Sequence, residues 1–176
     1  MDMVVLYGIN PTYKNMNIIK NFLSEKELNN YIDFHKNFYD YTKPNCFLHR
    51  KTKVLDCMGL ENEPLIKSMY YKLLDLCEKI DKKLTINYFQ IVEWPINESQ
   101  GEHIDFSYHP YTSVLYLNDN FEGGETVVNN QTYKPVKNSL ISFEGNKLKH
   151  KVTKITKGIR YTIPCWYKYI DNGKNS

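Results

Sequence analysis

Four side chains in the second half of the sequence have the types and spacings needed for metal chemistry. His103 and Asp105 form an H-x-D pair, His150 follows 45 residues after Asp105, and Arg160 follows ten residues after His150. Two histidines and one carboxylate can occupy one face of an octahedral Fe(II) ion and leave its other three positions open. Residues i and i+2 of a strand project from the same face, so the pattern predicts that His103 and Asp105 reach one ion together. A neighbouring strand would supply His150.

Arg160 strengthens the prediction of a metal site. Without it, the H-x-D pair could equally be an ordinary same-face pair on a surface strand. Arg160 is one of only two arginines, and it lies in the otherwise apolar segment 159–167. A buried guanidinium is costly unless an anion meets it. A dicarboxylate cosubstrate would provide that anion in a two-pronged geometry that lysine cannot match. A salt bridge to a nearby Glu or Asp is the alternative.

These residues belong to a longer series of motifs that covers about residues 84–169. The series runs His103-Ile-Asp105, Thr112-Ser-Val-Leu-Tyr-Leu-Asn118, Gly123-Gly-Glu-Thr126, Leu140-Ile-Ser-Phe143, His150-Lys-Val152 and Gly158-Ile-Arg-Tyr-Thr-Ile-Pro-Cys-Trp166. In this order and at these spacings, the series resembles the prolyl 4-hydroxylase-type members of the Fe(II)/2-oxoglutarate-dependent dioxygenases. The segment Asn21-Phe-Leu-Ser-Glu-Lys-Glu27 resembles the opening segment of that family more weakly.

The resemblance implies a set of site residues, position by position. The implied iron ligands are His103, Asp105 and His150, and the implied contacts of 2-oxoglutarate are Arg160 and Tyr116 at its 5-carboxylate and Thr126 in its pocket. Trp166 falls where relatives place an aromatic residue near the substrate entrance. Without the resemblance, Tyr116, Thr126 and Trp166 would each be interpreted as core residues.

Several positions depart from the family pattern or have no clear partner in the sequence. Trp94 stands nine residues before the first ligand, where many prolyl hydroxylases have a tyrosine that touches 2-oxoglutarate; its indole can donate but not accept. His109 is a spare imidazole that we expect near the metal ligands or on the surface. His35 and His49 are expected to be structural, and Arg50 to lie in a solvated loop.

The resemblance also implies the reaction, a hydroxylation of an unactivated C–H with succinate and CO₂ as co-products. The implied cofactors are Fe(II) and 2-oxoglutarate, with O₂ as co-reactant, and ascorbate stays an open candidate. Family analogy favours a peptide or protein substrate, with peptidyl proline converted to 4-hydroxyproline. A free amino acid or another protein side chain is also open, as are two other functions: a non-catalytic jelly-roll binding module, and oxidative demethylation of nucleic acid.

Charge, cysteine spacing and the lengths of apolar segments indicate which classes of protein the chain does not resemble. The net charge is +3, and the 21 lysines form no dense block, which argues against a dedicated nucleic-acid binder. The four cysteines, at 46, 57, 77 and 165, have no metal-binding spacing, so reduced thiols in a cytoplasmic protein are expected. The N-terminus lacks the features of a signal peptide, and no apolar run is long enough for a membrane helix.

The hydrophobic pattern predicts one domain over residues 1–176, mainly β with flanking helices. A short strand and a helix after the capping box Ser24–Glu27 are expected first, then a helix over 62–82, both within a helical part of about 16–82. The remainder predicts a jelly-roll core over about 84–169, with the helices packed on one sheet and a frayed tail at 171–176. The expected strands are 84–94, 102–107, 110–118, 125–129, 138–143, 148–155 and 159–169.

Overall fold

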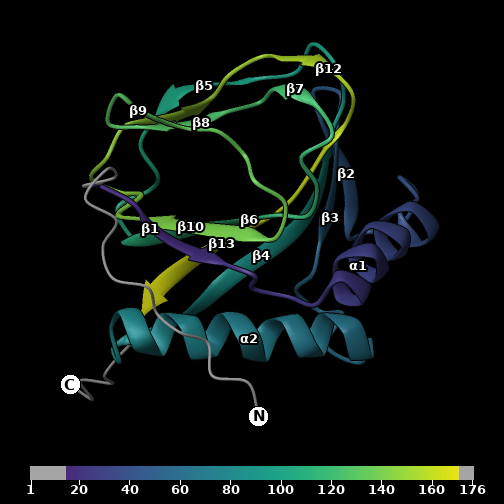
Figure 1. Ribbon diagram of the computed structural model, residues 1–176. Helices are drawn as coiled ribbons and strands as arrows, with labels where there is room; N and C mark the ends of the chain where they lie inside the picture. Colours follow the sequence, from purple (N-terminus) through teal and green to yellow (C-terminus); the bar gives the residue numbers. More distant parts are fainter. Residues whose placement is uncertain (1–14, 171–176) are drawn as a thin grey trace.

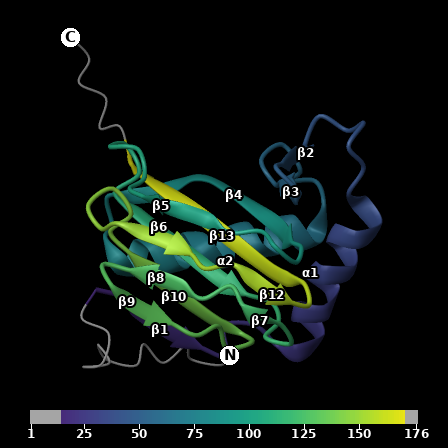
Figure 2. The same ribbon diagram turned by 90° about the horizontal axis from the view of Figure 1, so that it is seen from above.

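The computed structural model describes residues 15–170, which form antiparallel sheets and two helices (Figure 1). Two of the sheets face each other, and the helices cover the outer face of the larger one (Figures 1 and 2). The fold class expected from the sequence, a mainly β jelly roll with N-terminal helices packed on one sheet, is therefore confirmed. The expected tail at 171–176 lies outside the described residues.

The larger sheet has seven strands, all paired antiparallel with their neighbours. In spatial order they are β1 (Asn17–Lys20), β10 (Ser139–Phe143), β6 (Tyr111–Tyr116), β13 (Arg160–Tyr169), β4 (Leu84–Trp94), β3 (Thr52–Asp56) and β2 (Cys46–His49). The two longest strands, β4 and β13, pair along most of their length at the centre of this sheet. Residues at the ends of these strands therefore have well-defined positions.

The two smaller sheets lie opposite the large sheet, on the side away from the helices (Figure 1). A four-stranded sheet has the order β5 (Gln100–His103), β11 (His150–Val152), β8 (Thr126–Val128) and β9 (Gln131–Tyr133), and a two-stranded sheet pairs β12 (Ile155–Lys157) with β7 (Glu122–Gly123). The chain passes repeatedly between the large sheet and the small ones, as a jelly roll requires.

Both helices begin and end close to the positions that the sequence predicts. The helix α1 (Glu25–Phe38) has the expected capping box: the Ser24 hydroxyl accepts a hydrogen bond from the Glu27 N–H at 3.3 Å, and the Glu27 carboxylate accepts one from the Ser24 N–H at 2.8 Å. The helix α2 (Pro64–Ile80) has proline in its first turn. Among residues 15–170, neither helix combines the length and hydrophobicity that a membrane crossing needs.

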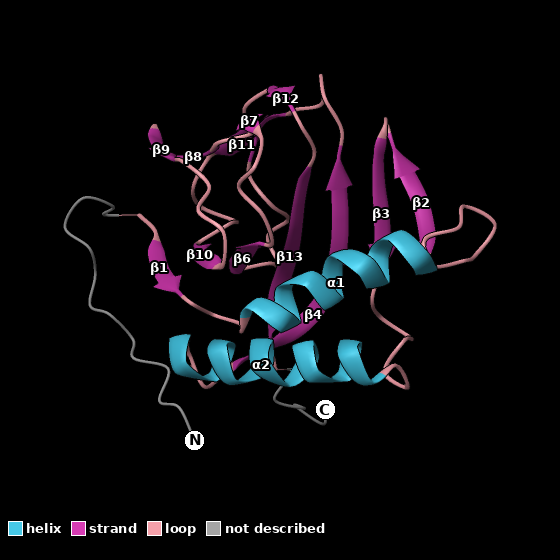
Figure 3. Ribbon diagram, turned by 45° about the vertical axis from the view of Figure 1, so that its right-hand side comes forward, coloured by secondary structure: helices cyan, strands magenta, loops and turns pink. Residues whose placement is uncertain are grey.

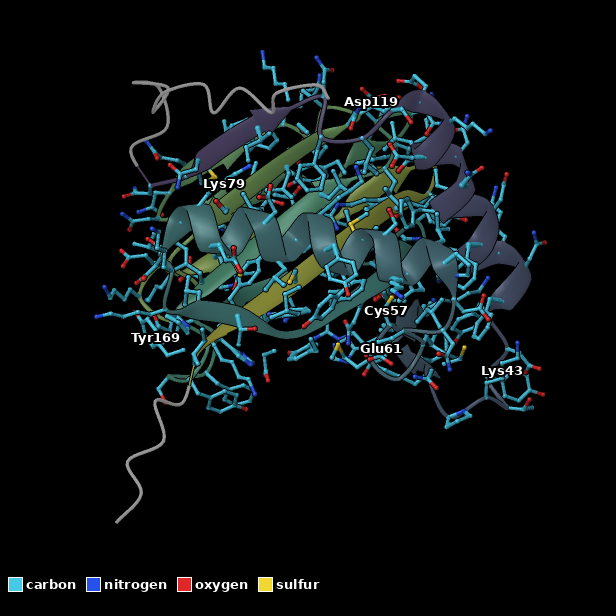
Figure 4. All side chains as sticks on the ribbon, turned by 90° about the horizontal axis from the view of Figure 1, so that it is seen from below. Lys43, Cys57, Glu61, Lys79, Asp119 and Tyr169 are labelled. Atoms are coloured by element: carbon cyan, nitrogen blue, oxygen red, sulfur yellow. The ribbon has the colours of Figure 1, made fainter. Side chains whose placement is uncertain are left out.

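The main core lies between the helices and the large sheet, as Figures 3 and 4 show from two directions. Helix α2 buries Ile66, Met69, Leu73, Leu76 and Cys77 against this sheet. A second, smaller cluster lies between the facing sheets and contains Tyr116, Val128, Tyr133, Ile141 and Phe143. Burial at about 25 cal/mol per Å² of apolar surface stabilises both layers.

Some expected strands are wrong in extent. The strand expected at 102–107 is β5, which ends at His103, so Asp105 lies beyond it. The strand expected at 148–155 is divided into β11 and β12, in different sheets. The β2–β3 hairpin was not expected at all, because Cys46–Asp56 mixes apolar and charged residues without strict alternation.

His35 is fully buried on α1, as its expected structural role requires. Its Nε2 donates to the Lys53 carbonyl at 3.3 Å, while its buried Nδ1 has no hydrogen-bond partner and lies 4.0 Å from the Glu93 carboxylate. Burial lowers the pKa of His35 below 6.5, although the Glu93 charge acts in the opposite direction. The Glu93 carboxylate forms an ion pair with Lys53 at 2.9 Å and accepts a hydrogen bond from the Tyr161 hydroxyl at 2.6 Å.

Because the folded state keeps His35 neutral, the unfolded state binds more protons below pH 6.5. The free energy of unfolding should therefore decrease as the pH falls below about 6.5. His35→Phe should make this decrease smaller, measured by urea unfolding at several pH values. His49→Phe, at the exposed end of β2, should leave it as in the wild type. An equal pH dependence in wild type and His35→Phe would contradict this account of His35.

Candidate metal and cosubstrate site

The pairing of β5 with β11 brings the two histidines of the H-x-D…H pattern together. His103 and His150 are direct partners in this register, and their ring centroids are 4.3 Å apart. His103 is partly exposed, whereas His150 is buried. The convergence that the sequence predicts for these two side chains is therefore present in the structure.

Asp105 reaches the same point by a different route from the one expected. Because β5 ends at His103, Asp105 lies in irregular backbone, where its N–H donates to the Gly145 carbonyl at 2.9 Å. The Thr112 hydroxyl donates to Asp105 Oδ2 at 2.5 Å, which leaves Oδ1 directed at the histidines. A Cβ at Gly145 would overlap both Asp105 Oδ2 and the Thr112 hydroxyl. Gly145 and Thr112 thus fix this carboxylate.

The three side chains present a ligand set suited to one cation. Asp105 Oδ1 lies 3.8 Å from His103 Nε2 and 3.6 Å from His150 Nε2, and all the candidate ligand atoms lie within 4.8 Å of one another. These distances exceed a hydrogen bond, so the three atoms surround a space rather than bonding to one another.

Backbone carbonyls determine which ring nitrogens face that space. His103 Nδ1 lies 2.8 Å from the Gly101 carbonyl, and His150 Nδ1 lies 2.9 Å from the Leu148 carbonyl. A carbonyl only accepts, so both Nδ1 atoms carry a proton, and in the neutral form of each ring the Nε2 lone pair faces this space. This is the tautomer that metal-binding histidines adopt.

Asp105 is held ionised despite its position in the cavity. Burial by itself raises the pKa of this carboxyl, but the neighbouring His150, Thr112 and Trp166 side chains outweigh it and lower the pKa below 3.8. A charged carboxylate beside two imidazole nitrogens is a ligand set suited to a divalent cation.

Arg160 lies at the start of β13, opposite Trp94 of β4, and is only 1% exposed. Among residues 15–170 no carboxylate pairs with it. Its Nη2 donates to the Thr126 hydroxyl at 3.4 Å, its Nε has no partner, and its guanidinium lies 5.2 Å from the Trp94 ring centroid. Burial lowers its pKa, an effect that Tyr116 opposes. The salt bridge considered as an alternative from the sequence is therefore not formed within the described residues.

Tyr116 and Thr126 adjoin the guanidinium but differ in access to the cavity. Their hydroxyls lie 2.5 Å apart, and the Tyr116 ring centroid is 5.4 Å from the guanidinium. Thr126 lines the cavity, whereas Tyr116 is completely buried behind it. Gly124, with φ of 66°, leaves room for the Arg160 side chain, because a Cβ added at this position would lie only 3.0 Å from Arg160 Cδ.

The two tryptophans both line the cavity. The Trp94 indole N–H is buried and has no partner, so a donor is available beside Arg160. Trp166 stacks on Tyr88 with ring centroids 4.6 Å apart, and its side chain helps to lower the pKa of Asp105. Burial, together with the Asp105 charge, raises the pKa of Tyr88 to about 12.

One cavity of about 640 Å³ contains the whole arrangement. The triad and Arg160 share it, and its other walls come largely from apolar and aromatic side chains of the large sheet. His109 is buried and lines it, and its Nε2 accepts from Asn87 Nδ2 at 2.7 Å. His49, which the sequence predicts to be structural, is exposed and lines the cavity. Arg50 is exposed as expected and donates to the Ser99 carbonyl at 3.2 Å.

Sequence reasoning missed several residues of this site. Tyr88, Thr112 and Gly145 are among them, and Phe47 contributes to the cavity wall from the unexpected hairpin. Thr112 opens the motif at 112–118, which is the sequence signal that could indicate its position near Asp105. The sequence carries no signal for Gly145, which lies in a turn far from Asp105 along the chain.

Gly145→Ala should displace Asp105 and weaken binding of a divalent cation about tenfold or more, as loss of a ligand-orienting contact commonly does. Titration with Co(II), followed by its visible absorption, would measure this. Gly101→Ala is the matched control, because a Cβ there meets nothing within 4 Å. Equal Co(II) affinity in both variants would show that Gly145 does not hold Asp105.

Sequence comparison with known proteins finds similarity over part of the chain. No family model matches the sequence. Human prolyl 3-hydroxylase 2 is 34% identical over 79 residues, which cover 40% of this chain and 11% of the human protein. The chain thus spans about a tenth of the length of the curated relatives it matches.

Solved structures match over most of the chain. A prolyl-4-hydroxylase from Pseudomonas putida superposes with a TM-score of 0.72 at 13% identity, covering 89% of this chain and 93% of the other. A Trichoplax adhaerens prolyl hydroxylase, in complex with a peptide fragment of the hypoxia inducible factor oxygen degradation domain, gives 0.71 at 20% identity and covers 94% and 88%. A 2OG-Fe(II) oxygenase family oxidoreductase from Burkholderia pseudomallei gives 0.70 at 17% identity and covers 88% and 84%. The chain therefore has the fold of the Fe(II)/2-oxoglutarate oxygenases, prolyl hydroxylases included.

Proposed function

We propose that the chain is an Fe(II)- and 2-oxoglutarate-dependent dioxygenase that hydroxylates an unactivated C–H of a peptide substrate. The observation that carries the proposal is the combination in one cavity of a two-histidine, one-carboxylate set with a buried arginine that lacks a carboxylate partner. Either feature alone is compatible with a purely structural role. Together they provide for a cation and for the far end of a dianionic cosubstrate.

The residues present fit both groups. His103, Asp105 and His150 would bind Fe(II) through two Nε2 atoms and Oδ1. The unpartnered Arg160 Nε and the Trp94 indole N–H are buried donors that a carboxylate could satisfy. With both groups bound, the iron centre supplies O₂ activation coupled to oxidative decarboxylation of 2-oxoglutarate, which yields succinate, CO₂ and the hydroxylated product.

The protein's own side chains orient and isolate that chemistry. The Gly101 and Leu148 carbonyls keep both Nε2 lone pairs free for the metal. Thr112 holds one oxygen of Asp105 so that the other remains a ligand. The Thr126 hydroxyl would contact the cosubstrate carboxylate together with Arg160, while Tyr116 orients Thr126 from behind.

The lining of the cavity favours a peptide over a free amino acid. Among the described residues, Asp105 is the only carboxylate that lines it, and Asp105 is needed by the metal. A free amino acid would bring an ammonium group with no counter-charge, which is costly to desolvate. A residue within a peptide chain brings neither terminal charge.

Peptidyl proline is the substrate we propose, with 4-hydroxyproline as the product. The prolyl hydroxylases with this fold, one of them complexed with a peptide fragment, support the residue type. The curated relatives are 3-hydroxylases matched over a short segment, so C3 is the alternative position.

A non-catalytic binding module is the rival function. Such a module could use the histidines for zinc or for structure. The burial of Arg160 argues against it, because a binding sheet gains nothing from an arginine whose Nε lacks a partner.

We also propose that the described residues form one domain and that the protein works in a reducing compartment such as the cytoplasm. All four cysteines are free and buried. Burial raises the pKa of Cys77 to about 11, so this thiol is unreactive. Ascorbate is a candidate reductant to be included in assays.

His150→Ala should abolish binding of Fe(II), because it removes one of three ligands. Arg160→Lys should leave metal binding intact but raise the dissociation constant of 2-oxoglutarate about tenfold or more, since one charge-assisted hydrogen bond is worth about 1.5–3 kcal/mol. Anaerobic calorimetric titration with Fe(II) measures metal binding, and subsequent titration with 2-oxoglutarate measures cosubstrate binding through the metal-to-cosubstrate absorption band.

His49→Ala and Arg50→Lys are the matched controls, because each changes the same residue type at an exposed position that belongs neither to the triad nor to the groups around Arg160. Both should bind metal and 2-oxoglutarate like the wild type. If Arg160→Lys lost metal and 2-oxoglutarate to the same extent, Arg160 would be structural.

Loaded enzyme supplied with O₂ should form succinate faster with proline-containing peptides than with free proline. Mass spectrometry of the peptide should show a gain of one oxygen, and amino-acid analysis would distinguish 4- from 3-hydroxyproline. Succinate formation with free amino acids alone would refute the peptide assignment, and no succinate under any condition would favour the binding module.

A further inference from the structure

We propose that residues 104–109 form a docking rim that selects peptides with proline or an aromatic residue beside the target residue. This inference rests on the proposed function and extends it to substrate selection. The segment connects β5 of the small sheet to β6 of the large sheet and contains the candidate ligand Asp105 (Figure 1). A substrate that approaches the metal site from this side would therefore contact the rim.

The rim exposes an unusual amount of apolar surface. Ile104, Phe106 and Tyr108 are 54%, 66% and 58% exposed. The rings of Phe106 and Tyr108 stack with centroids 5.3 Å apart and planes only 5° from parallel. Apolar surface concentrated in five residues beside a cavity is typical of an interaction site, whereas apolar residues exposed singly are common on any protein surface.

Hydrogen bonds hold the rim in this conformation, so its exposure is a fixed feature of the fold. The Asp105 N–H donates to the Gly145 carbonyl at 2.9 Å, and the His109 N–H donates to the Phe106 carbonyl at 2.8 Å. Asn146 Nδ2 donates to the Ser107 carbonyl at 3.0 Å. A surface held in place before binding loses little conformational entropy when a ligand docks.

Aromatic rings continue from the rim into the cavity. Tyr108 packs edge-on against His109 at 4.4 Å between centroids, His109 lies 5.5 Å from Tyr88, and Tyr88 stacks on Trp166 at 4.6 Å. His109, Tyr88, Trp166 and Asp105 all line the cavity. A series of contacting rings therefore leads from the exposed rim, through the buried His109, to the wall of the cavity that holds the candidate metal ligands.

The chemistry of this surface defines its occupant. Flat aromatic faces bind other rings by stacking and by apolar burial, and they offer little to a charged or small polar side chain. Ile104 and Phe106 also line the cavity, so a chain with its target residue at the metal would place its neighbouring residues on the rim. The occupant is thus a peptide segment with a proline or aromatic residue next to the target.

Fluorescein-labelled peptides of the form Gly-Ser-Gly-X-Pro-X-Gly-Ser-Gly, with X as Pro, Phe, Ser or Lys, would test this. Anisotropy is measured on protein loaded with Mn(II) and 2-oxoglutarate, which requires no turnover. We expect the Pro and Phe peptides to bind about tenfold more tightly than the Ser and Lys peptides. Phe106→Ser combined with Tyr108→Ser should remove this preference and leave Mn(II) affinity unchanged.

Tyr71→Ser is the matched control, because Tyr71 is also 58% exposed but lies on α2, on the outer side of the large sheet. It should keep the preference. Persistence of the preference in the double variant, or equal or absent binding of all four peptides, would overturn the inference. The proposed function fails separately, through absence of succinate formation, and binding alone decides the role of the rim.

Discussion

The antiparallel register between β5 and β11 is the constraint on which the rest of the site depends. It places His103 opposite His150, and a shift of one residue would turn one of the rings to the other face of the sheet. Each ring is then fixed by a backbone carbonyl, so the same small sheet sets both the position and the tautomer of the two candidate ligands. The strands are short, yet β11 is held on both sides, because it also pairs with β8, where His150 lies opposite Val128.

The second constraint is the cost of burying Arg160. A guanidinium that is fully buried without a carboxylate is unfavourable, and the surrounding Thr126 hydroxyl and aromatic faces offset only part of that cost. The fold tolerates it because the large core between the helices and the seven-stranded sheet supplies stability elsewhere. The main apolar core and the candidate site thus lie on opposite faces of the large sheet, and only a smaller apolar cluster lies on the cavity side.

Long periodic elements were the most predictable part of the fold. The capping box at Ser24 and the apolar stripe of residues 64–80 determine the two helices locally, and β4 has the limits that the sequence indicates. The β2–β3 hairpin and the end of β5 were not predictable, because they depend on pairing with strands distant in sequence. Strand alternation predicts the right neighbours for Asp105 but not the right cause. The backbone bond to Gly145 places this residue, and the Thr112 hydroxyl orients its carboxylate.

The sequence by itself determined the residue types and their order: two imidazoles and a carboxylate at recognisable spacings, followed by an arginine in an apolar strand. These are local properties, because each depends only on the type of a residue and on its immediate neighbours in the sequence. Only the tertiary structure decided that Arg160 has no carboxylate partner among the described residues, that Gly145 and Thr112 fix Asp105, and that the 104–109 rim stands exposed beside the cavity. Those facts depend on which distant segments become neighbours, and that is set by packing across the two facing sheets.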